Sequence, residues 1–155
     1  MEKQFGAAVT KIDNIERRFI VMAEWRYIKH LANENVIKET ESQLGVKFCN
    51  SFVAFIKKYN GGRPPISVFD TDKTEERTIK SFLSINPADT ENMIKSNLFV
   101  SKIRDDIVPF GIDNFGNYIC FSKSNENIVF LDFETGDIEK ITDGFDEFLK
   151  IVSGG

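Results

Sequence analysis

The chain has 155 residues and a formal net charge of −4 at pH 7, with 41% hydrophobic and 28% charged residues. This length fits one domain, which needs no disulfide or metal to fold because a chain of this size buries roughly 68–70% of its unfolded surface. No uncharged apolar run approaches the roughly 18 residues of a membrane span, and the start lacks the basic and then apolar plan of a secretory signal. We therefore expect a cytoplasmic protein that binds no membrane.

The charge is unevenly distributed along the chain. Residues 1–104 contain 17 Lys and Arg against 13 Asp and Glu, a balance of +4, whereas residues 105–155 contain 3 against 11, a balance of −8. A concentrated negative field disfavours nucleic acid as a direct ligand and favours a basic protein partner, whose association it accelerates. A solvated acidic surface without a partner explains the same tally.

Both cysteines and the many phenylalanines indicate an apolar core without cross-links. Cys49 and Cys120 lie in apolar sequence, where a free thiol behaves as a small hydrophobe. Free thiols predict a reducing compartment. Fifteen Phe residues predict a core of interlocking rings.

The first 32 residues predict a helix followed by an ambiguous segment. Apolar residues recur at spacings of three and four from residue 3 to 21, as in an amphipathic helix that docks on its own domain or binds a partner helix. This stripe consists of Phe5, Ala8, Ile12, Ile15, Phe19 and Met22. Residues 25–31 alternate imperfectly, so they end this helix, begin another or form a short strand.

Two helices with a short connection are expected next. Asn33 is a suitable N-cap for a helix that runs to Leu44, and Gly45 is placed to end it in the left-handed conformation. Asn50 is a suitable cap for a second helix, which Asn60-Gly61-Gly62 ends. Apolar residues at helical spacing in that second helix are Phe52, Phe55, Ile56 and Tyr59.

Short strands and a third helix are predicted between residues 63 and 98. Arg63-Pro64-Pro65 ends any helix there, because Pro lacks an N–H and clashes with the preceding turn. The polar run at 70–77 has no apolar anchor and is expected to be the most mobile segment. The predicted elements are strands at 66–69 and 78–85 and a helix at 88–98 with Asp89 or Thr90 near its cap.

Residues 106–121 predict the hairpin around which the fold is organised. Alternating apolar residues form two strands, and the polar link at 113–117 contains Gly116, which can take the positive φ that such a turn requires. Pro109 cannot donate to a ladder, so it places its strand at a sheet edge or lies at a strand start or a bulge. Strands at 127–133 and 138–141, joined by a turn at 134–137, extend the hairpin into an antiparallel meander.

A last helix completes an α+β fold. Thr142 or Asp143 is expected to cap it, and its apolar face contains Phe145, Phe148, Leu149 and Val152. The fold class is thus a single α+β domain, with a mainly antiparallel or mixed sheet flanked by N-terminal helices and a C-terminal helix.

Motifs for metal or nucleotide chemistry are incomplete. His30 is the single histidine, so zinc ligation and a Ser-His-Asp triad lack partners. The glycine spacing at 111–118 imitates a phosphate-binding loop, but Asn117 and Tyr118 stand where Lys and Ser or Thr are required. Residues 132–137 lack the alternating ligands of a calcium loop. We expect no metal and no cofactor.

Asp105, Asp106 and Asp113 are the remaining candidates for acid–base work or metal binding. No partner base and no nucleophile motif accompanies them, and Asp113 already has a place in the turn. The sequence therefore predicts a protein that is not an enzyme.

Several motifs in order resemble the SUKH superfamily, which includes Smi/Knr-type cell-wall regulators of fungi and many bacterial immunity proteins. They are Glu41–Phe48, Phe52–Gly62, Ile107–Phe121, Val129-Phe130 and Gly144–Leu149. The likeness covers residues 33–152, which suggests one SUKH-like domain with a helical extension at 1–32. Cys49 replaces a frequent Pro of the family and Gly144 a frequent Ser, which affects helix caps more than the fold.

The resemblance implies a binding protein that acts as the antidote to a polymorphic toxin, often a nuclease. Glu41 and Asn60-Gly61-Gly62 match recurrent family positions, but each has a structural duty at a helix end. The turn residues Asp113, Asn114, Gly116 and Asn117 serve either the turn or a partner.

Our hypothesis is a cytoplasmic bacterial immunity protein that covers the active surface of a basic, nuclease-like cognate toxin. Its predicted partner-binding residues are Asp113, Asn114, Gly116, Asn117, Asp132, Glu134 and Asp137. The alternatives are a regulatory interaction scaffold of the Smi/Knr type and a small hydrolase or ligand-binding domain.

Overall fold

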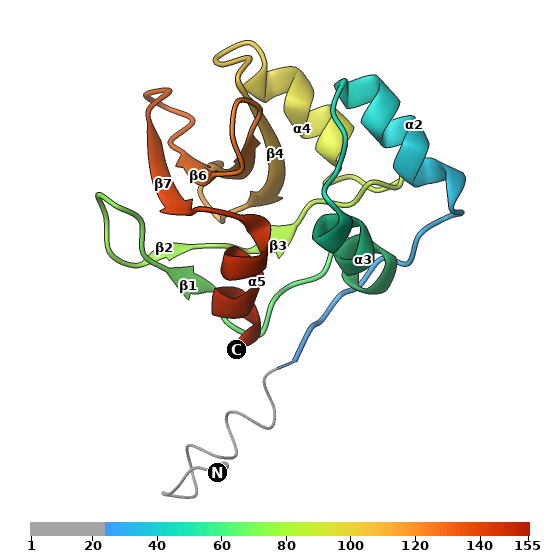
Figure 1. Cartoon of the computed structure of the whole chain (residues 1–155), viewed down its shortest axis with the longest axis horizontal. Coiled ribbons are helices and arrows are strands. Elements are labelled where there is room, and N and C mark those ends of the chain that lie inside the picture. Colours follow the sequence, from blue (N-terminus) through green and yellow to red (C-terminus); the bar gives the residue numbers. More distant parts are fainter. Residues whose placement is uncertain (1–23) are drawn as a thin grey trace, which may run out of the picture.

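Apolar residues after Asp106 form four of the five strands of the main sheet, in a computed structural model that describes residues 24–155 (Figure 1). Its strands are β3 (Ser81–Phe82), β4 (Ile107–Ile112), β5 (Tyr118–Ser122), β6 (Ile128–Leu131) and β7 (Ile138–Thr142). They lie in sequence order, and each pairs antiparallel with the next. The predicted hairpin and meander are confirmed.

Helices cover both faces of this sheet, which confirms the α+β class. They are α2 (Asn35–Leu44), α3 (Asn50–Tyr59), α4 (Met93–Val100) and α5 (Phe145–Ser153). Phe52 of α3 lies edge to face on Phe110 of β4 and Phe145 of α5, with ring centroids 5.9 and 5.1 Å apart. Val100 of α4 belongs to a second apolar cluster with Ile107 and Cys120. The predicted core of interlocking rings therefore lies between the sheet and α3 and α5.

The predicted strand at 78–85 is divided between two sheets. Its start is β2 (Arg77–Thr78), which pairs with β1 (Val68–Phe69) in a separate two-stranded sheet, and its middle is β3 of the main sheet. The segment passes from the small sheet to the main sheet between Ile79 and Lys80. The Ile79 N–H donates to the Ser67 carbonyl, whereas the next N–H, of Lys80, donates to the carbonyl of Ile112.

Pro109 lies in the interior of the main sheet. Its strand, β4, is paired on one side with β3 and on the other with β5, and the register of the second pairing shifts between Pro109 and Gly111. Of the alternatives for this proline, the bulge is therefore the one that occurs. The residue left out of the pairing is Phe110, whereas Pro109 stays opposite Cys120 and borders the bulge.

Helix ends follow the sequence more closely than helix starts. Gly45 ends α2 with φ 68°, as predicted. The predicted caps of α2 and α3 are displaced, because the N-cap of α2 is Glu34 rather than Asn33 and that of α3 is Cys49 rather than Asn50.

The start of α4 shows why one polar residue becomes the cap and another does not. Asn92 caps the helix by accepting from the N–H groups of Ile94 and Lys95, in place of the predicted Asp89 or Thr90. The Asp89 carboxylate instead accepts the hydroxyl of Ser84 at 2.6 Å. At α5 the N-cap is Gly144 rather than Thr142 or Asp143.

Residues 24–32 run along α3 as an irregular strap. Arg26 and Arg63 exchange both backbone hydrogen bonds, at 3.1 and 2.8 Å, so the strand alternative for residues 25–31 is realised only as an isolated bridge. Trp25 stacks on Tyr59 of α3, with ring centroids 4.7 Å apart. The predicted helix at 3–21 lies outside the described residues.

The polar loop at 70–77, which was expected to lack apolar anchors, is bound along the outer edge of β7 by hydrogen bonds. Asp72 forms two hydrogen bonds with the backbone of Lys140, donating its own N–H at 2.8 Å and accepting the Lys140 N–H at 2.9 Å. Thr71 and Thr74 donate their hydroxyls to Glu139. The anchors are polar, so a search for apolar residues does not reveal them.

Candidate functional site

The predicted partner-binding residues lie on two turns at one end of the main sheet. In a meander the β4–β5 and β6–β7 turns fall at the same end, and here the N–H of Phe133 donates to the Asn117 side-chain oxygen at 3.0 Å. The rings of Tyr118 and Phe133 also meet, with centroids 5.8 Å apart. We refer to the turns at 113–117 and 132–137, together with Ile103, as the turn face.

Asp113 and Asn117 hold the first turn together. Asp113 is 6% exposed and accepts three hydrogen bonds, from the backbone N–H groups of Phe115 and Asn117 at 2.8 Å and from the Asn117 side chain at 2.9 Å. Gly116 has φ 87°, as the turn requires. Within this turn, Asn114 is therefore the predicted contact residue whose polar side chain is exposed.

The second turn presents carboxylates to solvent. Asp132 accepts the N–H groups of Glu134 and Thr135 at 3.0 and 3.3 Å, so its side chain supports the turn. Glu134 and Asp137 are exposed. Arg104 donates to the carbonyl of Gly136 at 3.3 Å and so joins this turn to the segment before β4.

Arg104 also neutralises one of the neighbouring acids. Its guanidinium forms two hydrogen bonds with Asp106, at 2.9 and 2.7 Å, and this interaction lowers the pKa of the carboxyl. Asp106 and Asp113 lie at opposite ends of β4, and each has its own partners. The structure therefore does not bring them together as a pair for acid–base work.

Two apolar residues of the turn face were missed by the sequence reasoning. Phe115 is 81% exposed at the tip of the first turn, and Ile103 is 40% exposed. Ile103 packs on the second turn, since a methyl group added at Gly136 would lie 3.2 Å from its Cγ2 atom. The signal for Phe115 is in the sequence, because a large apolar residue inside a polar turn cannot be explained by the turn alone.

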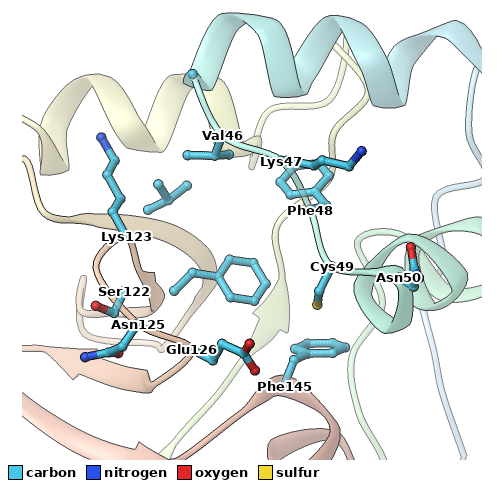
Figure 2. Close-up of a pocket in the computed structure, with 13 residues that line it drawn as sticks. Val46, Lys47, Phe48, Cys49, Asn50, Ser122, Lys123, Asn125, Glu126 and Phe145 are labelled. Carbon is cyan, nitrogen blue, oxygen red and sulfur yellow. The ribbon is translucent and has the colours of Figure 1, made fainter.

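A groove lies between the α2–α3 connection and the β5–β6 turn, with a volume of about 700 Å³ (Figure 2). Its walls are apolar and its rim is polar. The apolar lining is Val46, Phe48, Val108, Phe121 and Phe145, and the charged rim is Lys47, Lys123 and Glu126. Cys49 is exposed here and is free. Such a lining suits an apolar side chain or segment better than a reacting group.

The remaining candidates for chemistry are dispersed in the described part of the chain. Cys120 is buried, and burial raises the pKa of its thiol well above the usual value. His30 is exposed, and its backbone carbonyl accepts from Asn86 at 2.7 Å. Between residues 24 and 155, no three His, Cys, Asp or Glu residues are grouped as a metal site would require. No helix in this range has the length and apolarity to cross a membrane.

Comparisons with known proteins place the chain by its sequence. A crystal structure of a protein from Pseudomonas syringae pv. tomato is similar at 12% identity, over 73% of this chain and 80% of that chain, with a TM-score of 0.45. A search of curated proteins finds no match. The family model SUKH_6, described as SMI1-KNR4 cell-wall, matches residues 34–149. The chain therefore belongs to the SUKH family of SMI1-KNR4 proteins.

Proposed function

We propose that this protein is a cytoplasmic bacterial immunity protein, which binds a cognate toxin and covers its active surface. Membership of the SUKH family supports a protein-interaction role of the Smi/Knr type. The proposed toxin is a basic, nuclease-like protein, because nucleases hold phosphate groups with Lys and Arg side chains that an acidic protein surface can occupy.

The observation that carries this proposal is that most acidic side chains of residues 105–155 are not buried. Of the eleven Asp and Glu residues after residue 104, only Asp113 is buried. Asp106, Glu139 and Asp143 are paired with Arg104, Arg77 and Lys140. On the turn face, Glu134 and Asp137 are exposed and belong to no ion pair found among the described residues.

The test requires the toxin and one pair of charge reversals. A large protein with a toxic C-terminal domain, encoded beside this gene, would supply the probe, and that domain is co-purified with this chain. The variant is Glu134→Lys with Asp137→Lys, since both side chains are exposed and the turn does not depend on them. Asp132 stays unchanged, because its carboxylate accepts the backbone of Glu134.

The control carries the same change in net charge elsewhere. It is Glu39→Lys with Glu75→Lys, two exposed residues in α2 and in the 70–77 loop. We expect the turn-face pair to slow association about tenfold or more at low salt, and the difference to shrink as salt is added. Equal slowing by the control pair would mean that total charge matters and the turn face does not. Absence of binding by the unchanged chain would remove the proposed function.

A regulatory scaffold is the second candidate, and the groove favours it. A scaffold needs more than one surface, and the groove lies away from the turn face, between the α2–α3 connection and the β5–β6 turn. Under this alternative, the double variant Lys47→Glu and Lys123→Glu would lose binding of a partner. The variant with Glu134→Lys and Asp137→Lys would still bind that partner.

A further inference from the structure

The aromatic ring of Phe115 makes no contribution to the turn in which it lies. The turn is built by the carboxylate of Asp113, by the positive φ of Gly116 and by Asn117, which also accepts the N–H of Phe133. None of these interactions involves the ring, which is 81% exposed. Four hydrogen bonds and the backbone conformation of Gly116 nevertheless hold the turn that carries the ring. An exposed aromatic side chain on a well-held turn is the form that interface anchors take.

The surface next to the first turn is apolar as well. Tyr118, Phe133 and Ile138 are partly buried and pack on the second apolar cluster of the sheet, whose buried members are Val100, Ile107, Cys120, Val129 and Leu131. Ile103 extends this surface over the second turn. These residues form an apolar ledge next to the first turn, whose tip is Phe115, and the ledge rests on well-packed strands.

Acidic groups surround this ledge. Glu134 and Asp137 are exposed, and Asp132 is half-buried. Of the nearby cations, Arg104 is held by Asp106, and Arg77, which interacts with the charges of Asp113 and Asp132, is held by Glu139. This charge repels phosphate groups and anionic membranes, and it equally repels the same face of a second copy. The complementary occupant is a basic protein surface.

We infer that Phe115 is the anchor of the interface and inserts into an apolar pocket that is rimmed by Lys and Arg on the partner. This inference rests on the proposed function and adds the place and chemistry of the contact. The two kinds of residue then act on different rate constants. The buried ring determines how long the complex lasts, whereas the exposed acids determine how fast it forms.

The experiment measures both rate constants for the toxic domain from the neighbouring gene. Phe115→Ala should raise the dissociation rate by about tenfold to a hundredfold, which corresponds to the burial of one aromatic side chain, with less than about a threefold change in association. Phe115→Leu should dissociate at a rate between those of the unchanged chain and Phe115→Ala. The control is Ile151→Ala on α5, which removes another large apolar side chain that is 40% exposed. Thermal unfolding followed by circular dichroism verifies that all three variants fold.

The outcomes separate this inference from the function on which it rests. If the unchanged chain binds the toxic domain and Phe115→Ala dissociates no faster than Ile151→Ala, the anchor is refuted and the proposed function stands. If the unchanged chain does not bind the domain, both fail together. If sedimentation shows a dimer that Phe115→Ala dissociates, the ring serves a second copy of this chain and the inference of a basic partner is wrong.

Discussion

Arg77 and Glu139 form an ion pair, with Nη2 and Oε2 2.9 Å apart, that joins the small β1–β2 sheet to strand β7 of the main sheet. Their side chains are only 26% and 13% exposed. The Arg77 guanidinium also lies over the ring of Phe130, 4.5 Å from its centroid. Because Arg77 and the hydroxyls of Thr71 and Thr74 donate to the carboxylate, the pKa of Glu139 falls from 4.5 to about 2.

The first prediction concerns the pH dependence of this pair. A carboxyl whose pKa is lower in the folded state stabilises the fold above its unfolded pKa of 4.5, and this contribution is lost as the pH falls through about 2. Glu139→Gln should therefore lower the free energy of unfolding by about 2–3 kcal/mol at pH 7. The difference from the unchanged protein should narrow between about pH 4.5 and pH 2. Urea unfolding at several pH values measures this difference in unfolding free energy. The control is Glu134→Gln, at an exposed position. A difference that is constant with pH would contradict the prediction.

The second prediction concerns the junction of α2 and α3. The N–H of Phe48 donates to the Glu41 carboxylate at 2.7 Å, which fulfils the structural duty expected of that residue. Glu41→Ala leaves the backbone group without this charged acceptor and should cost about 1.5–3 kcal/mol of unfolding free energy. The neighbouring Gln43→Ala, at an exposed position of the same helix, should change it by less than about 0.5 kcal/mol. Equal denaturation midpoints for the two variants would show that the hydrogen bond is not needed.

The third prediction compares two residues of the turn face, one that holds the first turn together and one that is exposed. Asp113→Ala removes the acceptor of three hydrogen bonds in the first turn, so it should destabilise the protein by about 2–4 kcal/mol. Asn114→Ala should leave stability unchanged, because that side chain is exposed. Thermal and denaturant unfolding give the comparison. If Asp113→Ala unfolds like the unchanged protein, the carboxylate serves something other than the turn.

The fourth prediction concerns the strap that precedes the family-matched region. The ring of Trp25 contacts the rings of Phe55, Tyr59 and Phe82, with centroids 5.2, 4.7 and 5.6 Å away. Trp25→Ala should cost about 2–4 kcal/mol, and a chain that begins at residue 33 should lose at least as much. Tyr27→Ala, where the ring is 63% exposed, should cost far less.

Circular dichroism is the suitable readout, because Trp25 is the single tryptophan and its loss removes the fluorescence signal. A chain from residue 33 with full stability would refute the role of the strap.

Local chemistry was enough to predict the elements whose partners are close in sequence. The hairpin at 106–121 combines strand alternation with a turn that needs Gly116, and both signals agree. Gly45 likewise marks the end of α2, because the left-handed conformation favours glycine wherever the helix lies.

Elements that depend on distant partners could not be placed in this way. The 78–85 segment reads as one strand, but Ile79 bonds to Ser67 and Lys80 to Ile112, so only the surrounding sheets decide where it divides. Asp89 and Asn92 are both acceptable caps by residue type. Asp89 is engaged by Ser84, which leaves the cap of α4 to Asn92.

The sequence by itself determined the order of strands in the meander, the turn chemistry and the acidic bias of the last third, because each depends on neighbouring residues or on a simple count. Only the tertiary structure decided which of the acids are used internally. It engages Asp113 within its turn and Glu139 with Arg77, and it leaves Glu134, Asp137 and the ring of Phe115 on one exposed face. The physical reason is that exposure and pairing are set by contacts between segments far apart in the chain, which no local pattern encodes.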